Sequence, residues 1–262
     1  MNIVNAFLFT CACVGLQIEA VAGTIDKPVT MQFGEQVTLQ STILKENRNI
    51  IVHLPSGYKK SKQRYPVLYL LDGERHLYHS VIATELLHKA GQIPELIIVA
   101  VTNNEGMRQK NLNTHSEKFT LFLTNEVMTH VDKHYRTVGK NTLFGHSLAG
   151  FYTVNLLANT AVNFENYIAA SPPLQGDDID LYNKIIAPTN DDKMRNKTLY
   201  LTLATHKEEG EDVANAMHNF VKLLAESSPQ GFDWHYTPLK GDTHITTSYL
   251  TLFYGIRYVF KD

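Results

Sequence analysis

Residues 142–150 (Thr-Leu-Phe-Gly-His-Ser-Leu-Ala-Gly) constrain the fold of this chain more than any other segment. They predict a short buried strand, a tight turn that carries Ser147, and the start of a helix. Such a turn holds a serine hydroxyl above the edge of a sheet. It needs small residues because strand and helix pass close together, and Gly145 and Ala149 supply them. The pattern alone would occur by chance in roughly one chain in five of this length, so the surrounding segments must support it.

Short apolar runs alternate along the chain with segments whose apolar residues recur at helical spacing. Two strands are predicted first, at 35–44 and 49–54, with a turn at 45–47. The later predicted strands are 66–71, 96–101, the strand before Ser147, 167–170, 198–204 and 232–237, and the predicted helices are 76–89, 117–134, the one after Ser147, 212–226 and 249–260. Buried strands that alternate with helices form a mostly parallel sheet covered on both faces. The sequence therefore predicts an α/β fold.

Residues 1–22 differ in composition from the rest of the chain. Their centre is apolar, and residues 20–22 (Ala-Val-Ala) fit the small-x-small pattern of a signal-peptide cleavage site. No Lys or Arg precedes the apolar stretch, and a buried first strand or helix is the alternative interpretation. Both cysteines, Cys11 and Cys13, fall in this segment, so the cleaved chain would contain no disulfide and no thiol. The sequence predicts a signal peptide over 1–22 and export to a bacterial periplasm or the medium.

Charge and composition exclude several classes of partner. The formal net charge is −2 and there is no basic run, so nucleic acid is not an expected partner. No apolar stretch reaches the roughly 18 residues of a membrane span, so stable membrane insertion is not expected. His130 and His134 lie four apart on a predicted helix, a spacing that can bind metal, but no third ligand accompanies them. We expect both histidines to be structural or exposed and to bind no metal; the oligomeric state is left open.

Polar residues with catalytic potential follow several of the predicted strands. Active groups gather at the carboxyl ends of parallel strands in an open α/β sheet. Ser147 follows one strand, and His244 follows the last strand in the segment 241–244 (Gly-Asp-Thr-His). A serine becomes a strong nucleophile when a histidine takes its proton and a carboxylate orients that histidine. The sequence therefore predicts Ser147 as nucleophile and His244 as base.

Three glutamates between these two residues are candidates for the acid. They follow the strand at 198–204, which gives the order serine, acid, histidine along the chain. Glu209 is favoured, followed by Glu208 and then Glu211. Asp242 stands too close to His244 in sequence for easy pairing of the two side chains.

The loop after the strand at 66–71 and the loop after the next strand complete the predicted site. An oxyanion requires two N–H donors, for which Leu148 and Gly73 are the candidates. Arg108 is a candidate for binding a carboxylate or polar group of the substrate, and His76 for lining the pocket. The other residues assigned to the substrate pocket are Asp72, Asn103 and His146.

The chain resembles the putative esterase family of α/β hydrolases, which is related to esterase D and to esterases of trilactone siderophores. The segments that carry the resemblance are 69–73 (Tyr-Leu-Leu-Asp-Gly), 97–101 (Ile-Ile-Val-Ala-Val), 131–137 (Val-Asp-Lys-His-Tyr-Arg-Thr), 145–150 (Gly-His-Ser-Leu-Ala-Gly), 170–172 (Ala-Ser-Pro) and 254–260 (Tyr-Gly-Ile-Arg-Tyr-Val-Phe). The resemblance implies one α/β-hydrolase domain over 23–262, with Ser147, Gly73 and His244 in the family's roles. Residues 205–208 depart from the Gly-rich, acid-bearing turn that the family would place there.

Residues and resemblance together predict a serine esterase that cleaves a small-molecule carboxylic ester through an acyl-enzyme, without a cofactor. Acyl transfer to an alcohol or sugar is the alternative within the same fold. A catalytically silent binding protein is the alternative from another class. The presence of a serine, a histidine and an acid in the expected order argues against a silent fold.

Overall fold

The computed structural model describes residues 27–114, 116–159, 164–176, 178–187 and 191–261. Phe33–Asp262 is one compact unit, and residues 27–32 belong to a separate N-terminal unit in which they form no regular secondary structure. The predicted signal peptide and both cysteines lie outside the described residues. Within the described part of the chain, no helix is long and apolar enough to cross a membrane.

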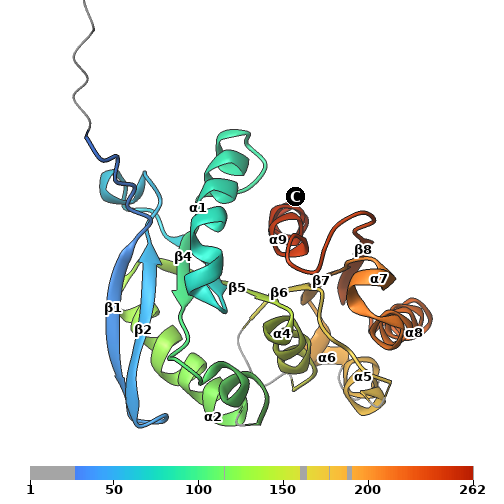
Figure 1. Ribbon diagram of the computed structural model, residues 1–262. Coiled ribbons are helices and arrows are strands. Elements are labelled where there is room, and N and C mark those ends of the chain that lie inside the picture. Colours follow the sequence, from blue (N-terminus) through green and yellow to red (C-terminus); the bar gives the residue numbers. More distant parts are fainter. Residues whose placement is uncertain (1–26, 115, 160–163, 177, 188–190, 262) are drawn as a thin grey trace, which may run out of the picture. The chain divides into compact units, whose positions relative to one another are not determined.

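An eight-stranded sheet forms the centre of the larger unit in the described part of the chain (Figure 1). Its strands are β1 (Glu35–Ser41), β2 (Glu46–His53), β3 (Tyr65–Leu70), β4 (Ile97–Val101), β5 (Thr137–His146), β6 (Asn166–Ala170), β7 (Thr198–Leu203) and β8 (Asp233–Pro238). They lie in the order β1-β2-β4-β3-β5-β6-β7-β8. β2 is antiparallel to β1 and β4, and all other neighbours are parallel. The prediction of a mostly parallel α/β sheet is confirmed.

Helices follow most of the parallel strands. The α-helices are α1 (Gly73–Lys89), α2 (Ser116–Leu121), α3 (Thr129–His134), α4 (Leu148–Asn159), α5 (Ile179–Ile186), α6 (Asp191–Met194), α7 (His206–Glu209), α8 (Glu211–Ser227) and α9 (Thr247–Val259). A 3-10 turn, η1 (Tyr58–Lys60), and two π-helical segments, η2 (Lys110–Thr114) and η3 (Phe122–Met128), complete the set. The carboxyl ends of the parallel strands therefore lead into helix N-termini, which is where the candidate site lies.

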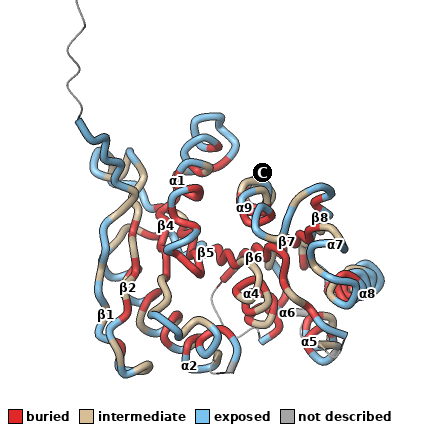
Figure 2. The backbone as a smooth tube through the Cα atoms, in the orientation of Figure 1, coloured by how far each residue is buried: buried red, intermediate tan, exposed pale blue. Residues whose placement is uncertain are grey.

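The two faces of the sheet form two separate hydrophobic clusters. Side chains of a strand alternate between the faces, so in β3 Val67 and Tyr69 belong to the cluster that also contains residues of α4 and α8, whereas Leu68 and Leu70 belong to the cluster that also contains residues of α1 and α9. Figure 2 shows the central strands buried and the outer surfaces of the helices exposed. Because both faces of the sheet are covered, its carboxyl edge and the loops there are left for a binding site.

The first hairpin differs from the prediction. Its turn lies at 42–45, and Glu46, expected in the turn, begins β2. The carboxylate of Glu126 accepts hydrogen bonds from the main-chain N–H of Thr42 (2.8 Å) and of Ile43 (3.2 Å). A side chain more than eighty residues away thus stabilises the turn, and no local pattern could have indicated it.

The predicted helices also need correction. The predicted helix at 117–134 is divided into α2, η3 and α3, with a π-helical segment in its middle. The predicted loop at 102–116 contains η2 and the start of α2. Helix α1 begins at Gly73, three residues before the predicted start, so it places the backbone N–H of Gly73 at a helix N-terminus.

Candidate active site

Ser147 occupies a sharp turn between β5 and α4. Its φ of 58° lies in the left-handed region, which costs a residue with a side chain about 1–3 kcal/mol and is typical of functional turns. The N–H of Ser147 donates to the Ala170 carbonyl oxygen at 2.9 Å. A Cβ on Gly145 would lie only 2.2 Å from the Ala149 oxygen. Glycine is therefore required at 145 for the strand and helix to approach each other as they do.

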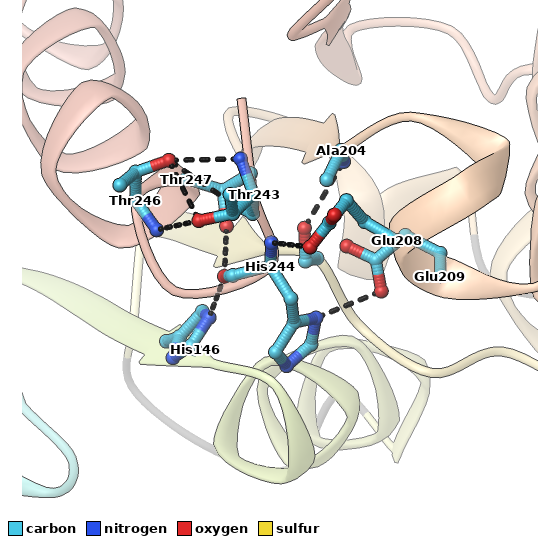
Figure 3. Close-up of polar contacts among 9 residues, drawn as sticks. His146, Ala204, Glu208, Glu209, Thr243, His244, Thr246 and Thr247 are labelled. Carbon is cyan, nitrogen blue, oxygen red and sulfur yellow. Dashed lines mark hydrogen bonds and ion pairs between the residues drawn. The ribbon is translucent and has the colours of Figure 1, made fainter. Parts of the chain in front are cut away.

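His244 lies in the loop between β8 and α9, and its ring contacts a carboxylate (Figure 3). His244 Nδ1 is 2.8 Å from Glu209 Oε2, and the Glu209 side chain is only 4% exposed. A carboxylate oxygen accepts, so Nδ1 carries the hydrogen and Nε2 of the neutral ring carries the lone pair. This is the tautomer that a base requires.

The electrostatics of this pair agree with the contact. The hydrogen bond from His244 to the Glu209 carboxylate raises the pKa of His244 above its usual value, against the opposing effect of burial. Burial raises the pKa of Glu209, but the hydrogen bond that its carboxylate accepts from His244 and the nearby hydroxyl of Ser171 outweigh burial and leave the pKa below its usual value. Glu209 is thus ionised at neutral pH and favours a positive charge on His244.

The other two candidate glutamates lie elsewhere. Glu208 is exposed, and its Oε2 lies 3.5 Å from the main-chain nitrogen of His244 rather than near the ring. Glu211 is exposed at the start of α8. Of the three glutamates, the structure places Glu209, the favoured one, against the imidazole.

The short helix α7 explains why Glu209 faces the histidine. The carbonyl oxygen of Thr205 accepts hydrogen bonds from the N–H groups of Glu208 (2.9 Å) and Glu209 (3.1 Å), which closes one helical turn. Gly210 ends this turn at a φ of 87°, a conformation that glycine adopts without strain. Residues 205–210 were expected only as a loop, and this turn separates the directions of two adjacent glutamates.

The two predicted oxyanion donors both stand at helix N-termini. Gly73 is the first residue of α1 and Leu148 the first residue of α4. N–H groups in the first turn of a helix have no acceptor within that helix, and they favour negative charge. A Cβ on Gly73 would lie 2.6 Å from the carbonyl carbon of Ala100. Glycine at 73 therefore allows α1 to begin directly beside β4.

Asp72, Asn103 and Arg108 form one hydrogen-bonded network. Arg108 donates from Nε to Asp72 Oδ1 (2.8 Å) and from Nη2 to Oδ2 (2.7 Å), and Asn103 Nδ2 donates to Oδ1 (2.6 Å). The Asp72 side chain is 1% exposed, whereas that of Arg108 is 28% exposed. Asp72 therefore supports its two neighbours, and Arg108 keeps an accessible surface. Their predicted role in substrate binding stays a prediction.

Two predicted pocket histidines lie close to the serine turn. The ring of His146 and the buried ring of His76 are 5.8 Å apart between centroids. Burial lowers the pKa of His146 to about 4 and that of His76 to about 3. Both rings are therefore neutral at pH 7, and His146 already uses Nε2 in a 2.7 Å contact with the main-chain oxygen of His244.

Ser171 belongs to the site although the sequence did not single out its side chain. It follows β6 at a φ of 42° and is fully buried. Its Oγ accepts a hydrogen bond from the Ala204 N–H at 3.2 Å, and its hydroxyl contributes to the low pKa of Glu209. The available signal was its position directly after a buried strand, the same signal that identified Ser147.

The histidine pair His130 and His134 lies on α3, outside this site. The rings of His130 and His134 stack at 4.1 Å, and His134 Nδ1 donates to the His130 carbonyl oxygen at 2.8 Å. Among the described residues, no group of three or more histidine, cysteine, aspartate or glutamate side chains is arranged to hold a metal ion.

Comparison with known proteins connects this geometry to a family. The sequence model described as "Putative esterase" matches residues 41–242. Ferri-bacillibactin esterase BesA of Bacillus subtilis is 25% identical over 138 residues, which are 50% of this chain and 47% of that protein, so the chain spans about half the length of this curated relative.

Solved structures give a similar result. An IroE-like serine hydrolase from Shewanella oneidensis has a TM-score of 0.77 at 25% identity, covering 87% of this chain and 80% of the other. Siderophore hydrolase EstB from Aspergillus nidulans has a TM-score of 0.73 at 18% identity, covering 90% and 98%. The second similarity concerns the fold alone.

Proposed function

Because the chain belongs to the "Putative esterase" family, we propose that it hydrolyses small-molecule carboxylic esters through a covalent acyl-enzyme. The observation that carries the proposal is the buried Glu209 carboxylate on Nδ1 of His244, 2.8 Å away. The strained turn at Ser147 supports it, because a left-handed serine at a strand-to-helix junction is typical of nucleophiles. In this proposal Ser147 is the nucleophile, His244 the base and Glu209 the orienting acid.

In the first half of the reaction, Ser147 Oγ attacks the ester carbonyl carbon while His244 Nε2 takes the hydroxyl proton. The carbonyl oxygen becomes negative and accepts hydrogen bonds from the N–H groups of Gly73 and Leu148. The C–O bond to the alcohol then breaks, and His244 gives its proton to the leaving oxygen. Ser147 remains esterified by the acyl group.

In the second half, water takes the place of the alcohol. His244 Nε2 removes a proton from the water as its oxygen attacks the acyl carbon, and the same proton returns to Ser147 Oγ as the acid leaves. In both halves Glu209 stabilises the imidazolium and holds the ring orientation. The protein's residues supply nucleophile, base and oxyanion donors.

The substrate class can be tested with a panel of esters. Siderophore esters are our first choice, because BesA and EstB are named as a ferri-bacillibactin esterase and a siderophore hydrolase. The panel adds p-nitrophenyl esters of increasing acyl length and feruloyl esters, and kcat/KM is measured for each. A parallel series with an added alcohol separates hydrolysis from acyl transfer. If no ester in the panel is cleaved or transferred, the proposal is wrong.

The raised pKa of His244 predicts the pH dependence. The base must be unprotonated, so kcat/KM rises with pH along a limb whose apparent pKa lies above the usual value of about 6.5. In Glu209→Gln the stabilising charge is gone, the pKa of His244 falls, and the limb moves to lower pH. Measurements of kcat/KM with an uncharged ester from about pH 5 to 9 test this. A limb that does not move in Glu209→Gln would contradict the pairing.

We also propose that the chain is exported. The basis is the apolar segment that ends in Ala20-Val21-Ala22, which lies outside the described residues. Cleavage after Ala22 would give a mature protein that begins at Gly23. N-terminal sequencing of the periplasmic fraction of a bacterium that expresses the full chain tests this, and intact Met1 in a protein confined to the cytoplasm would reject it.

A further inference from the structure

The side chain of His146 connects the serine turn to the loop that carries His244. His146 Nε2 lies 2.7 Å from the main-chain oxygen of His244, and the two ring centroids are 4.8 Å apart. In Figure 3, the His244 residue lies between His146 on one side and Glu209 on the other. This hydrogen bond connects the main chain of the proposed base, His244, to the side chain of His146. His146 immediately precedes the proposed nucleophile, Ser147.

The direction of the hydrogen bond follows from the acceptor. A carbonyl oxygen only accepts, so the hydrogen must be on Nε2 of His146. Burial lowers the pKa of His146 to about 4, and the ring is neutral at pH 7 with a lone pair on Nδ1. Since Nε2 keeps its hydrogen in both the neutral and the protonated ring, the bond persists across the working range of an esterase.

The loop around His244 has few other ties to the sheet edge among the described residues. Thr247 Oγ1 donates to the same His244 oxygen at 2.7 Å, and Thr243 bonds to Thr246, but all these residues belong to the loop or to the start of α9. Glu208 and Glu209 contact His244 from α7. His146, at the carboxyl end of β5, contacts His244 from the opposite side.

The backbone of His146 is itself fixed. Arg108 Nη2 lies 3.4 Å from the His146 carbonyl oxygen, a weak contact, while two short bonds hold Arg108 on the buried Asp72. The N–H of the next residue, Ser147, donates to Ala170. A bond from this rigid turn can therefore define the position of the more exposed His244 loop.

We propose that His146 is a positioning residue, which holds the main chain of His244 at the distance from Ser147 that proton transfer requires. The inference rests on the proposed function, because the position of His244 matters only if His244 is the base. His146 itself takes no part in the chemistry. A misplacement of about 1 Å in an active site can cost on the order of 10²-fold in rate. Loss of the bond also frees the His244 ring to leave Glu209 for part of the time.

Three substitutions of His146 separate the hydrogen bond from packing. Phe keeps a ring of similar shape without a donor, Asn has a donor that is too short to reach, and Gln places an amide N–H₂ at about the reach of Nε2. We expect His146→Phe and His146→Asn to lower kcat by about 10- to 100-fold with little change in KM. We expect His146→Gln to keep most of the wild-type rate. The acid limb of the pH profile of kcat/KM, where the rate rises as His244 loses its proton, should move to lower pH in His146→Phe and His146→Asn. In His146→Gln it should lie where it does in the wild type.

His79→Phe is the matched control. His79 is a buried α1 histidine of the same ring cluster, 5.2 Å from the His76 ring, and its ring nitrogens have no hydrogen-bond partner in the described part of the chain. We expect it to keep kcat and the acid limb of the wild type. Thermal unfolding of every variant shows which of them are folded. If His146→Phe does not fold, His146→Asn takes its place.

The outcomes are distinguishable from failure of the proposed function. If the wild type is active and both His146→Phe and His146→Asn keep its kcat and acid limb, the inference about His146 is overturned. It is also overturned if His146→Gln restores neither quantity. If the wild type has no esterase activity, the proposed function fails, and amide hydrogen exchange of residues 241–247 then decides the inference. Faster exchange in His146→Phe and His146→Asn than in the wild type and Gln supports it, and equal exchange overturns it.

Discussion

Ser147→Ala is expected to lower kcat for ester hydrolysis by about 10⁶-fold, the size of effect found when a hydrolase loses its nucleophile. The hydroxyl is the group that forms the proposed acyl-enzyme, and no neighbour can replace it in the left-handed turn at φ 58°. Residual activity would come from the N–H groups at the N-termini of α1 and α4 and from substrate binding. The measurement is single-turnover and steady-state hydrolysis of the best ester of the panel.

Ser80→Ala is the control for this experiment. Ser80 is also buried, but its Oγ donates to the His76 carbonyl oxygen within its own helix α1. It should keep kcat near that of the wild type. A Ser147→Ala protein that retains kcat within about tenfold of the wild type would mean that another group is the nucleophile.

Glu209→Gln is expected to lower kcat by at least about 10²-fold with little change in KM. Loss of the orienting carboxylate costs on the order of 10⁴-fold in the best-studied protease triad. Here the amide of Gln would have to face the Nδ1 side of His244 at a position where the Glu209 side chain is only 4% exposed, and it cannot stabilise the imidazolium. Because Glu209 acts on the proton transfer and not on the bound ester, the effect belongs in kcat.

Glu208→Gln and Glu211→Gln are the matched controls. Both glutamates are exposed, and neither contacts the ring of His244 in the described structure. We expect near-normal kcat from both, with a small effect at Glu208 because its charge contributes to the raised pKa of His244. If all three variants keep near-normal kcat, the enzyme works as a serine–histidine dyad or its acid lies elsewhere. If Glu208→Gln alone is impaired, the acid is Glu208.

The central strands β3 and β4 could be predicted from the sequence because they are buried on both faces. The runs 66–71 and 96–101 are continuously apolar, and β3 and β4 coincide with them to within one residue. The hairpin turn could not be predicted, because the Glu126 carboxylate that stabilises it comes from a distant part of the chain. The π-helical segment from Phe122 to Met128 was equally hidden, since its apolar spacing still resembles that of an α-helix.

The positions of the candidate site residues were predictable to the extent that strand ends define them. Ser147 and His244 follow strands, and the structure brings their loops together through His146. The sequence alone could not decide firmly between Glu209 and its neighbour Glu208 as the acid. The decision depends on the direction that each side chain takes from the single turn of α7.

The hydrogen-bonded network around Asp72 could not be predicted from the sequence. A strand-end carboxylate suggests an open pocket, but Asp72 is held by Arg108 and Asn103 and is buried. Ser171 was missed because its importance comes from its proximity to Glu209, which lies on a different strand connection. Such pairings are tertiary, and no local spacing encodes them.

The most direct test of the central claim is covalent capture of the nucleophile. Wild-type protein, Ser147→Ala and Glu209→Gln are each incubated with a fluorophosphonate probe, and intact-mass spectrometry and peptide mapping follow the adduct over time. We expect one adduct per chain, located on Ser147, with slower labelling in Glu209→Gln and none in Ser147→Ala. An unlabelled wild type, or an adduct that persists in Ser147→Ala, would contradict the assignment of Ser147 as an activated nucleophile.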